Sequence, residues 1–244
     1  MRRPPAARRL LLLSCPAAVA LSLAGCNLSP SSAPSSAPAP SASSAAPPRA
    51  TSAAGTVSCE YTPADEAAKP VEPPPTTDVP ATGTATYTLA LTGGDVTITM
   101  DRRAAPCTVN SFASLADQGY FDGTRCHRLA DSGIFVLQCG DPTGTGSGGP
   151  GYAFAGETTG SETYTQGVVA MANAGPGTNG SQFFLVWADS TGLDRRPNYT
   201  IFGKMDAASR DVVAQMAGEG QDGSNPDGTG RPNNPSEISK VTRG

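Results

Sequence analysis

Apolar and polar residues alternate over several short stretches of this chain, and the pattern predicts a domain built mainly of β-strands. Residues 85–91 and 95–100 alternate on either side of Gly93 and Gly94, as the two arms of a hairpin do. Two short strands around a turn are predicted within residues 126–141, and single strands at residues 167–171, 182–187 and 238–243.

Two segments carry helical spacing instead. From Pro106 onward, Val109, Phe112 and Leu115 recur on one side of a predicted helix that Gly119 closes. A second helix is predicted at about residues 208–217, with a glycine as its stop. Many short strands with two helices favour a closed antiparallel β-barrel whose ends the helices plug.

The first 26 residues read as an export signal. Four arginines precede an apolar run at residues 10–24, which Pro16 interrupts and which is too short to span a bilayer comfortably. Residues 23–26 (LAGC) resemble the bacterial lipobox, so we expect lipidation at Cys26; a simple cleaved signal is the alternative. Acyl chains would hold the protein on the outer face of the cell membrane, an extracytoplasmic location.

Composition divides the remainder of the chain. Residues 27–82 are rich in Ser, Ala, Pro and Thr, with few large apolar side chains, and we predict a disordered tether there. Residues 83–244 then form the folded domain. Cys59 is out of place in such a tether.

Charge and residue types exclude several classes of function. Without residues 1–26 the chain has 13 basic and 21 acidic residues, which disfavours a nucleic-acid partner. With a single histidine and no CxxC pair, we expect no metal site and no cofactor. The run at 144–149 satisfies GxGxxG but leads into Pro150 rather than a helix, so dinucleotide binding is not expected.

Four cysteines follow the signal: Cys59, Cys107, Cys126 and Cys139. An even number in an exported chain favours disulfides, and four cysteines allow three pairings. We favour Cys107 with Cys126 and Cys59 with Cys139, the latter clipping the tether to the domain.

The stretch 171–186, MANAGPGTNGSQFFLV, joins two apolar runs through a glycine-rich loop. Such a loop exposes backbone groups that an extended peptide could pair with, although an ordinary hairpin connection is the alternative. Together with CHRLADSGIFVLQCGD at 126–141 and NYTIFGK at 198–204, it resembles the cyclophilin family of peptidyl-prolyl isomerases. The resemblance covers residues 84–243 and implies an eight-stranded barrel with two capping helices.

The resemblance also implies the site residues. Catalytic roles fall on Arg128, Gln138 and Phe135. Substrate contacts fall on Val136, Ala172, Asn173, Ala174, Gln182, Phe184, Leu193 and Tyr199. Arg128 would approach the prolyl amide; for the residue taken alone, a surface ion pair is the alternative.

The chain departs from the family pattern at two of these residues and at Gly192, just before Leu193. Val136 stands where many relatives have methionine, and Tyr199 where the best-known eukaryotic members have histidine. Gly192 replaces the tryptophan of cyclosporin-sensitive members, so we expect weak cyclosporin binding with the isomerase activity kept.

These observations predict a monomeric peptidyl-prolyl cis-trans isomerase that acts on proline-containing segments of exported proteins without a cofactor. A binding module that holds such segments without turnover, as a chaperone, is the alternative. Both functions need a groove that binds the proline-containing segment, but only catalysis needs Arg128 beside that groove.

Overall fold

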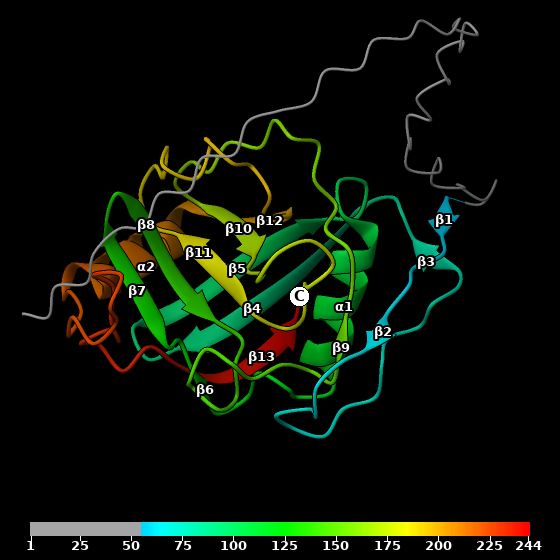
Figure 1. Ribbon diagram of the computed structural model, residues 1–244, viewed down its shortest axis with the longest axis horizontal. Coiled ribbons are helices and arrows are strands. Elements are labelled where there is room, and N and C mark those ends of the chain that lie inside the picture. The colour runs from blue at the N-terminus through cyan, green and yellow to red at the C-terminus, as the bar shows by residue number, and fades with distance from the viewer. Residues whose placement is uncertain (1–54) are drawn as a thin grey trace, which may run out of the picture. The chain divides into compact units, whose positions relative to one another are not determined.

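The computed structural model describes residues 55–244, and its main feature is one nine-stranded antiparallel sheet (Figure 1). The strand order is β6-β13-β4-β5-β12-β10-β11-β8-β7. The strands are β4 (Thr84–Leu91), β5 (Gly94–Asp101), β6 (Thr124–Arg125), β7 (Arg128–Ser132), β8 (Ile134–Cys139), β10 (Val168–Met171), β11 (Phe183–Val186), β12 (Ile201–Met205) and β13 (Glu237–Arg243). The mainly β class with two helices is confirmed.

The sheet curls back toward itself but does not close. Its two edge strands, β6 and β7, are separated by only two residues in the chain. They do not pair with each other; Leu129 of β7 instead exchanges backbone hydrogen bonds with Gly230, at 2.7 and 3.2 Å. The barrel is therefore nine-stranded and incompletely closed, where eight strands and full closure were predicted.

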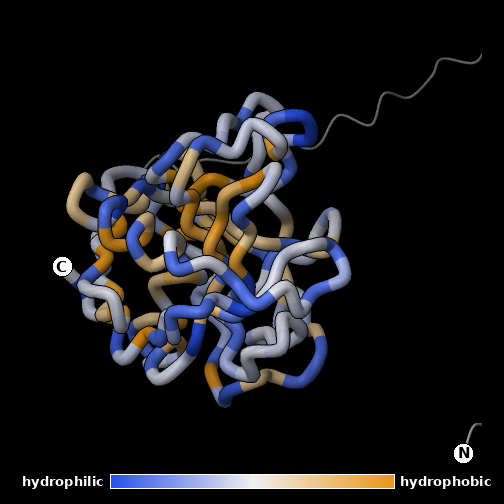
Figure 2. Tube along the Cα trace, turned by 90° about the vertical axis from the view of Figure 1, so that its left-hand side faces the viewer, coloured by the Kyte–Doolittle hydropathy of each residue, from blue (hydrophilic) through white to orange (hydrophobic). Residues whose placement is uncertain are grey.

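The β4–β5 hairpin follows the predicted alternation. Tyr87 and Leu89 of β4 are buried, as are Val96 and Ile98 of β5. At Gly93 a Cβ would lie 2.4 Å from the side chain of Met216, which would have to move to make room for it. The turn can thus pack directly against the second helix. In Figure 2 several hydrophobic stretches of the chain lie in the middle of the domain, with many hydrophilic stretches around them.

Both predicted helices are present within two residues of their expected ends. Helix α1 (Pro106–Asp117) begins with proline, and the carboxylate of Glu157 accepts from the backbone N–H groups of Cys107 and Thr108, at 3.1 and 2.8 Å. Helix α2 (Ala207–Gly218) is capped by Asp206, which accepts from Ser209 N at 2.8 Å. The pKa of Asp206 is lowered by that bond.

Residues 55–82, here called the strap, correct one prediction. They were expected to belong to the tether, but the structure packs them on the domain beside α1 (Figure 1). Short strands β1 (Thr56–Val57) and β3 (Val79–Pro80) pair with each other, and β2 (Thr62–Pro63) pairs with β9 (Tyr152–Ala153). The predicted signal peptide, Cys26 and the rest of the tether lie at residues 1–54, outside the described residues.

Polar contacts also hold the strap, beside the small apolar cluster that includes Val57 and Val79. The Lys69 ammonium donates to the carbonyls of Gly119 and Asp122, at 2.6 and 3.1 Å, just beyond the end of α1. The Tyr61 hydroxyl donates to Cys107 O at 2.8 Å. Composition could not reveal these bonds, because they depend on where the helix ends lie.

The disulfides also differ from the predicted pairing. Cys59 is bonded to Cys107 in the first turn of α1, and Cys126 is bonded to Cys139. The second bond closes the open end of the β7–β8 hairpin, where Cys126 lies two residues before Arg128 and Cys139 one residue after its partner Gln138; the Cα atoms of the two cysteines are 3.9 Å apart. Cys59 does clip the N-terminal segment to the domain, but through α1.

Candidate active site

An apolar cluster on the outer side of β8, β10 and β11 gathers most of the predicted pocket residues. Val136 and Phe184 are buried in it, and Ala172, Leu193 and Tyr199 pack against it. The Phe184 and Tyr199 rings meet edge to face, with centroids 5.5 Å apart. These five side chains come from four separate segments, so only the folded sheet brings them together.

Phe135 is placed differently from the prediction. It is not part of this cluster, and its ring packs edge-on against Trp187 with centroids 5.0 Å apart. Trp187 in turn donates from its indole N–H to Ala130 O at 3.1 Å. Phe135 therefore supports the β8–β11 face in this structure.

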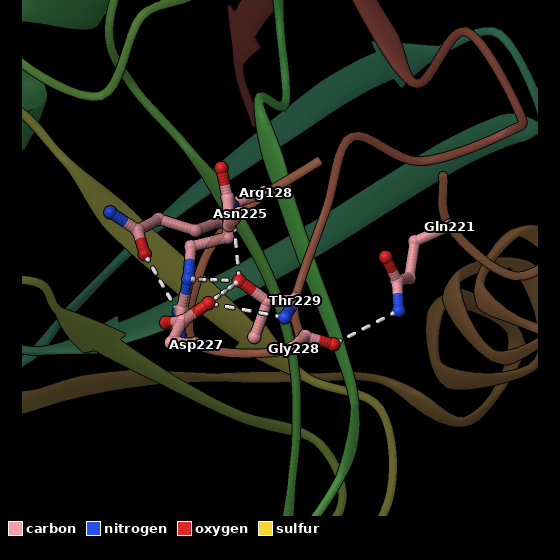
Figure 3. A network of polar contacts seen from close by, with 7 residues as sticks. Arg128, Gln221, Asn225, Asp227, Gly228 and Thr229 are labelled. Carbon is pink, nitrogen blue, oxygen red and sulfur yellow. Dashed lines mark hydrogen bonds and ion pairs between the residues drawn. The ribbon is translucent and has the colours of Figure 1, made fainter. Parts of the chain in front are cut away.

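Arg128 lies at the start of β7, directly opposite Gln138 on β8. Its Nη1 donates to Gln138 Oε1 at 3.4 Å. Its Nε donates to Thr229 Oγ1 at 3.0 Å, and its Nη2 donates to Asp227 Oδ2 at 3.1 Å (Figure 3). The side chain is 26% exposed. Arg128 thus faces the predicted glutamine and also forms the ion pair that was the alternative.

The hydrogen bonds continue from Arg128 along the surface. Gln138 Nε2 donates to Gln182 Oε1 at 2.9 Å. Gln182 Nε2 donates in turn to the carbonyls of Gly146 and Gly148, at 2.9 and 3.0 Å. The hydrogen-bonded side chains of Arg128, Gln138 and Gln182 are here called the relay. Its bonds hold both predicted glutamines between the arginine and the glycine-rich run.

That run is folded around a buried carboxylate. Asp141 accepts from Thr143 N at 2.7 Å and from Gly146 N at 2.7 Å. Burial alone would raise the pKa of Asp141, but these bonds, with those from Thr143 Oγ1 and Gly148, lower it. A Cβ on Gly148 would lie 2.0 Å from Asp141 Oδ1, so the sequence needs glycine there.

In the loop after β10, the backbone of Asn173 is free to pair with an extended peptide. The Asn173 side chain donates to Asn198 O at 3.0 Å, which holds the loop against the next segment. Neighbouring Ala172 N donates to Gln182 O at 2.9 Å. Within residues 55–244 the backbone N–H and carbonyl of Asn173 have no hydrogen-bond partner, so an extended segment could pair with both.

Comparison with known proteins decides what this arrangement belongs to. The family model described as "Cyclophilin type peptidyl-prolyl cis-trans isomerase/CLD" matches residues 86–243. The chain belongs to this cyclophilin family. The match covers the whole sheet except the first residues of β4, and it excludes the strap.

Relatives with related names come from mycobacteria. "Probable peptidyl-prolyl cis-trans isomerase B" of Mycobacterium leprae is 46% identical over 187 residues, which are 68% of this chain and 62% of that protein. "Peptidyl-prolyl cis-trans isomerase A" of Mycobacterium tuberculosis is 41% identical, with 65% and 92% covered. The chain therefore spans about six-tenths of the length of the B-type relative.

Solved structures agree on the fold. A Cryptosporidium parvum cyclophilin type peptidyl-prolyl cis-trans isomerase is 28% identical with a TM-score of 0.58, covering 66% of this chain and 98% of that one. The same protein in the presence of the dipeptide Ala-Pro gives a TM-score of 0.55, with 64% and 97% covered.

Two site residues of this cyclophilin domain were missed by sequence reasoning. Asp227 and Thr229 lie in the connection between α2 and β13, residues 219–236, here called the anchor loop. The Thr229 hydroxyl donates to Asp227 Oδ1 at 2.6 Å, and this bond, more than Arg128, lowers the pKa of Asp227 to about 2. An acid followed by Gly-Thr-Gly signals a turn, but nothing in the sequence points that turn at Arg128.

Two hollows flank the relay of the cyclophilin domain. One, of about 480 Å³, lies between the loop 172–174 and the strap and is lined by Gln138 and Gln182. The other, of about 350 Å³, is lined by Arg128, His127 and residues of the anchor loop. A third hollow of about 520 Å³, lined by residues 99–101, 103–104 and 201–204 among others, holds none of the predicted site residues.

Only 9% of His127 is exposed, and burial, the largest cause, lowers its pKa, so the imidazole is neutral near pH 7. A Cβ on Gly192 would lie 2.6 Å from Gly133 O, which leaves no room for the tryptophan of cyclosporin-sensitive members. Within residues 55–244 no cluster of three His, Cys, Asp or Glu side chains could hold a metal.

Proposed function

We propose that this chain is a peptidyl-prolyl cis-trans isomerase that acts on proline-containing segments of exported proteins. The observation that carries the proposal is the relay Arg128–Gln138–Gln182 beside the apolar cluster and the open backbone of Asn173. The cluster suits a proline ring, and the Asn173 backbone suits the residue before it.

The chemistry requires no covalent intermediate. Amide resonance imposes a barrier of about 18–20 kcal/mol on rotation of the X–Pro bond. An acceleration of about 10⁵ needs about 7 kcal/mol of extra binding to the transition state. When the bond twists, the prolyl nitrogen becomes pyramidal, and its lone pair can accept a hydrogen bond from a guanidinium.

Arg128 is suited to supply that bond. A guanidinium has about five N–H donors, of which three are used by Gln138, Thr229 and Asp227. Two N–H groups are therefore left for a substrate. The three occupied donors fix the plane of the group, so little side-chain freedom is lost when the substrate arrives.

The test compares Arg128→Ala with the wild type in a cis–trans exchange assay by NMR on a proline tetrapeptide. We expect the variant to lose about 100-fold or more of the catalysed rate. Arg125→Ala is the matched control, because Arg125 is 70% exposed and pairs with Glu237 away from the relay. Equal rates for Arg128→Ala and wild type would instead favour the non-catalytic binding module.

Export and lipidation belong to the same proposal. Two disulfides suit an oxidising compartment, and the leader ends in the lipobox-like LAGC. Neither helix within residues 55–244 is long and apolar enough to cross a membrane. We expect fatty-acid labelling of the expressed full chain to be lost in Cys26→Ser and kept in the leader control Cys15→Ser; labelling of Cys26→Ser would refute the anchor.

The monomeric state and weak cyclosporin binding are also part of the proposal. Light scattering during gel filtration should give the mass of one chain. Calorimetry with cyclosporin should detect binding weaker than micromolar, and sub-micromolar inhibition would contradict the reading of Gly192.

A further inference from the structure

The hollow of about 480 Å³ beside the relay has one wall that the cyclophilin match does not include. On one side lie Ala172, Asn173 and Gln182, which belong to the predicted substrate site. On the other side lie residues 64–66 of the strap. A segment outside the shared domain therefore borders the groove.

This part of the strap is fixed at both ends. Ala64 N donates to Gly151 O at 3.0 Å, and Ala68 N donates to Gly149 O at 2.8 Å. Between these bonds lie Asp65 and Glu66, which both line the hollow. Both side chains are exposed.

The charge of the hollow comes from these two acids. Of the described residues that line it, only Asp65 and Glu66 carry a charge. The positive charge of Arg128 lies beyond Gln138 and is paired with Asp227. The nearby Asp141 adds a further negative charge beneath the glycine-rich run.

The alternation of side chains along a bound, extended peptide determines which of its residues enters the hollow. Successive side chains of an extended segment point to opposite faces. With the proline ring in the apolar cluster and the preceding residue along the Asn173 backbone, the residue two positions before the proline points to the same side as the ring. It then enters the hollow lined by Gln138 and Gln182.

We propose that the strap makes this cyclophilin select segments with lysine or arginine two positions before the proline, through Asp65 and Glu66. The inference rests on the proposed isomerase function. The long stem of a lysine would lie along the wall of the hollow, and its ammonium would reach the acids at the rim.

The test measures kcat/KM by NMR exchange for three blocked tetrapeptides, Lys-Ala-Pro-Phe, Ala-Ala-Pro-Phe and Glu-Ala-Pro-Phe. Two exposed acids should favour the lysine peptide over the glutamate peptide by about threefold to tenfold at low salt. The ratio should fall toward one in about 0.5 M salt. In the double variant Asp65→Asn/Glu66→Gln it should fall toward one at low salt as well.

Glu60→Gln is the matched control, because Glu60 is an exposed acid of the strap that does not line the hollow. It should keep the wild-type ratio. No catalysis of the alanine peptide by wild type would refute the isomerase function itself. Catalysis with equal rates for the lysine and glutamate peptides, or a ratio that survives the double variant, would overturn the inference alone.

Discussion

The strap and the anchor loop are both polar segments without helices or long strands, yet they are held in place in different ways. The strap is crosslinked by Cys59–Cys107 and buries Val57 and Val79 in a small cluster with those cysteines. The anchor loop, by contrast, has no apolar side chain other than three prolines between residues 219 and 236.

The anchor loop is ordered by its own hydrogen bonds. Asp222 accepts from Arg231 N at 2.9 Å, and Asn233 donates to Glu219 O at 2.9 Å. Asp227 and Thr229 then hold Arg128. The difference teaches that a polar segment can be held in two ways: the strap by a covalent crosslink, and the anchor loop by many weak bonds that extend to Arg128.

The largest expected effect is on the strap. Replacing Cys59 and Cys107 together by serine should lower the free energy of unfolding by about 4 kcal/mol in the chain-entropy model. The bond joins residues 48 apart in the chain, which makes the loss large. Urea denaturation measures it, and a loss below about 1 kcal/mol would mean that the strap is held without the crosslink.

Removing the disulfide Cys126–Cys139 in the same way is the matched comparison. That bond joins residues only 13 apart, and the same relation gives about 3 kcal/mol. A larger loss than for the strap crosslink would contradict the ranking by loop length.

A smaller effect is expected at Lys69. The variant Lys69→Met keeps the stem but removes the ammonium that bonds Gly119 and Asp122, and should cost about 1–2 kcal/mol of stability. Thermal and urea unfolding measure this loss. Lys240→Met is the control, because Lys240 is exposed on β13; an equal effect of both variants would show that Lys69 has no special role.

The anchor loop should show its effect on catalysis rather than on stability. Asp227→Asn removes the charge that pairs with Arg128, and kcat/KM should fall by up to about fivefold. The pKa of Asp227 is lowered to about 2, so its carboxylate stays ionised through the pH range in which an ordinary aspartate is protonated. The ion pair with Arg128 is therefore lost only as the pH falls toward 2.

The decrease for Asp227→Asn should therefore be the same at pH 5 and pH 8. Asp211→Asn is the control, since Asp211 is an exposed acid on α2 that contacts neither Arg128 nor the anchor loop in the described residues. A decrease that grows with pH across this interval would assign the effect to another group.

The smallest effect concerns His127, which lines the hollow shared with the anchor loop. Burial lowers its pKa, so the unfolded chain binds more protons near pH 6 and stability falls as pH drops below about 6.5. The loss between pH 7 and pH 6 is at most about 0.7 kcal/mol. His127 is the only histidine of the chain, so in the variant His127→Gln this loss of stability should be absent. Urea denaturation at pH 7 and at pH 6 measures it.

The sheet and the groove were largely predictable from the sequence. The β4–β5 hairpin, both helices and the β7–β8 hairpin follow from alternation, helical spacing and glycine stops, which are local signals. The apolar cluster was found through the family pattern, and five of its predicted members meet in the structure. Phe135 is the exception, because its ring has Trp187 as a nearer partner.

The strap, the disulfide pairing and the support of Arg128 were not predictable. Composition counts apolar side chains, and the strap is fastened by Lys69 and Cys59 to groups whose positions only the fold defines. Likewise, Asp227 lies 99 residues from Arg128 in the chain, and no periodic pattern connects them.

The bridge between Leu129 and Gly230 has one more consequence. Strand β7 is an edge of the sheet, and a bare edge invites another chain to add a strand and begin aggregation. Gly230 already occupies the backbone groups of Leu129, so the anchor loop shields that edge. A protein whose anchor loop were shortened would lose its solubility as well as the support of its arginine.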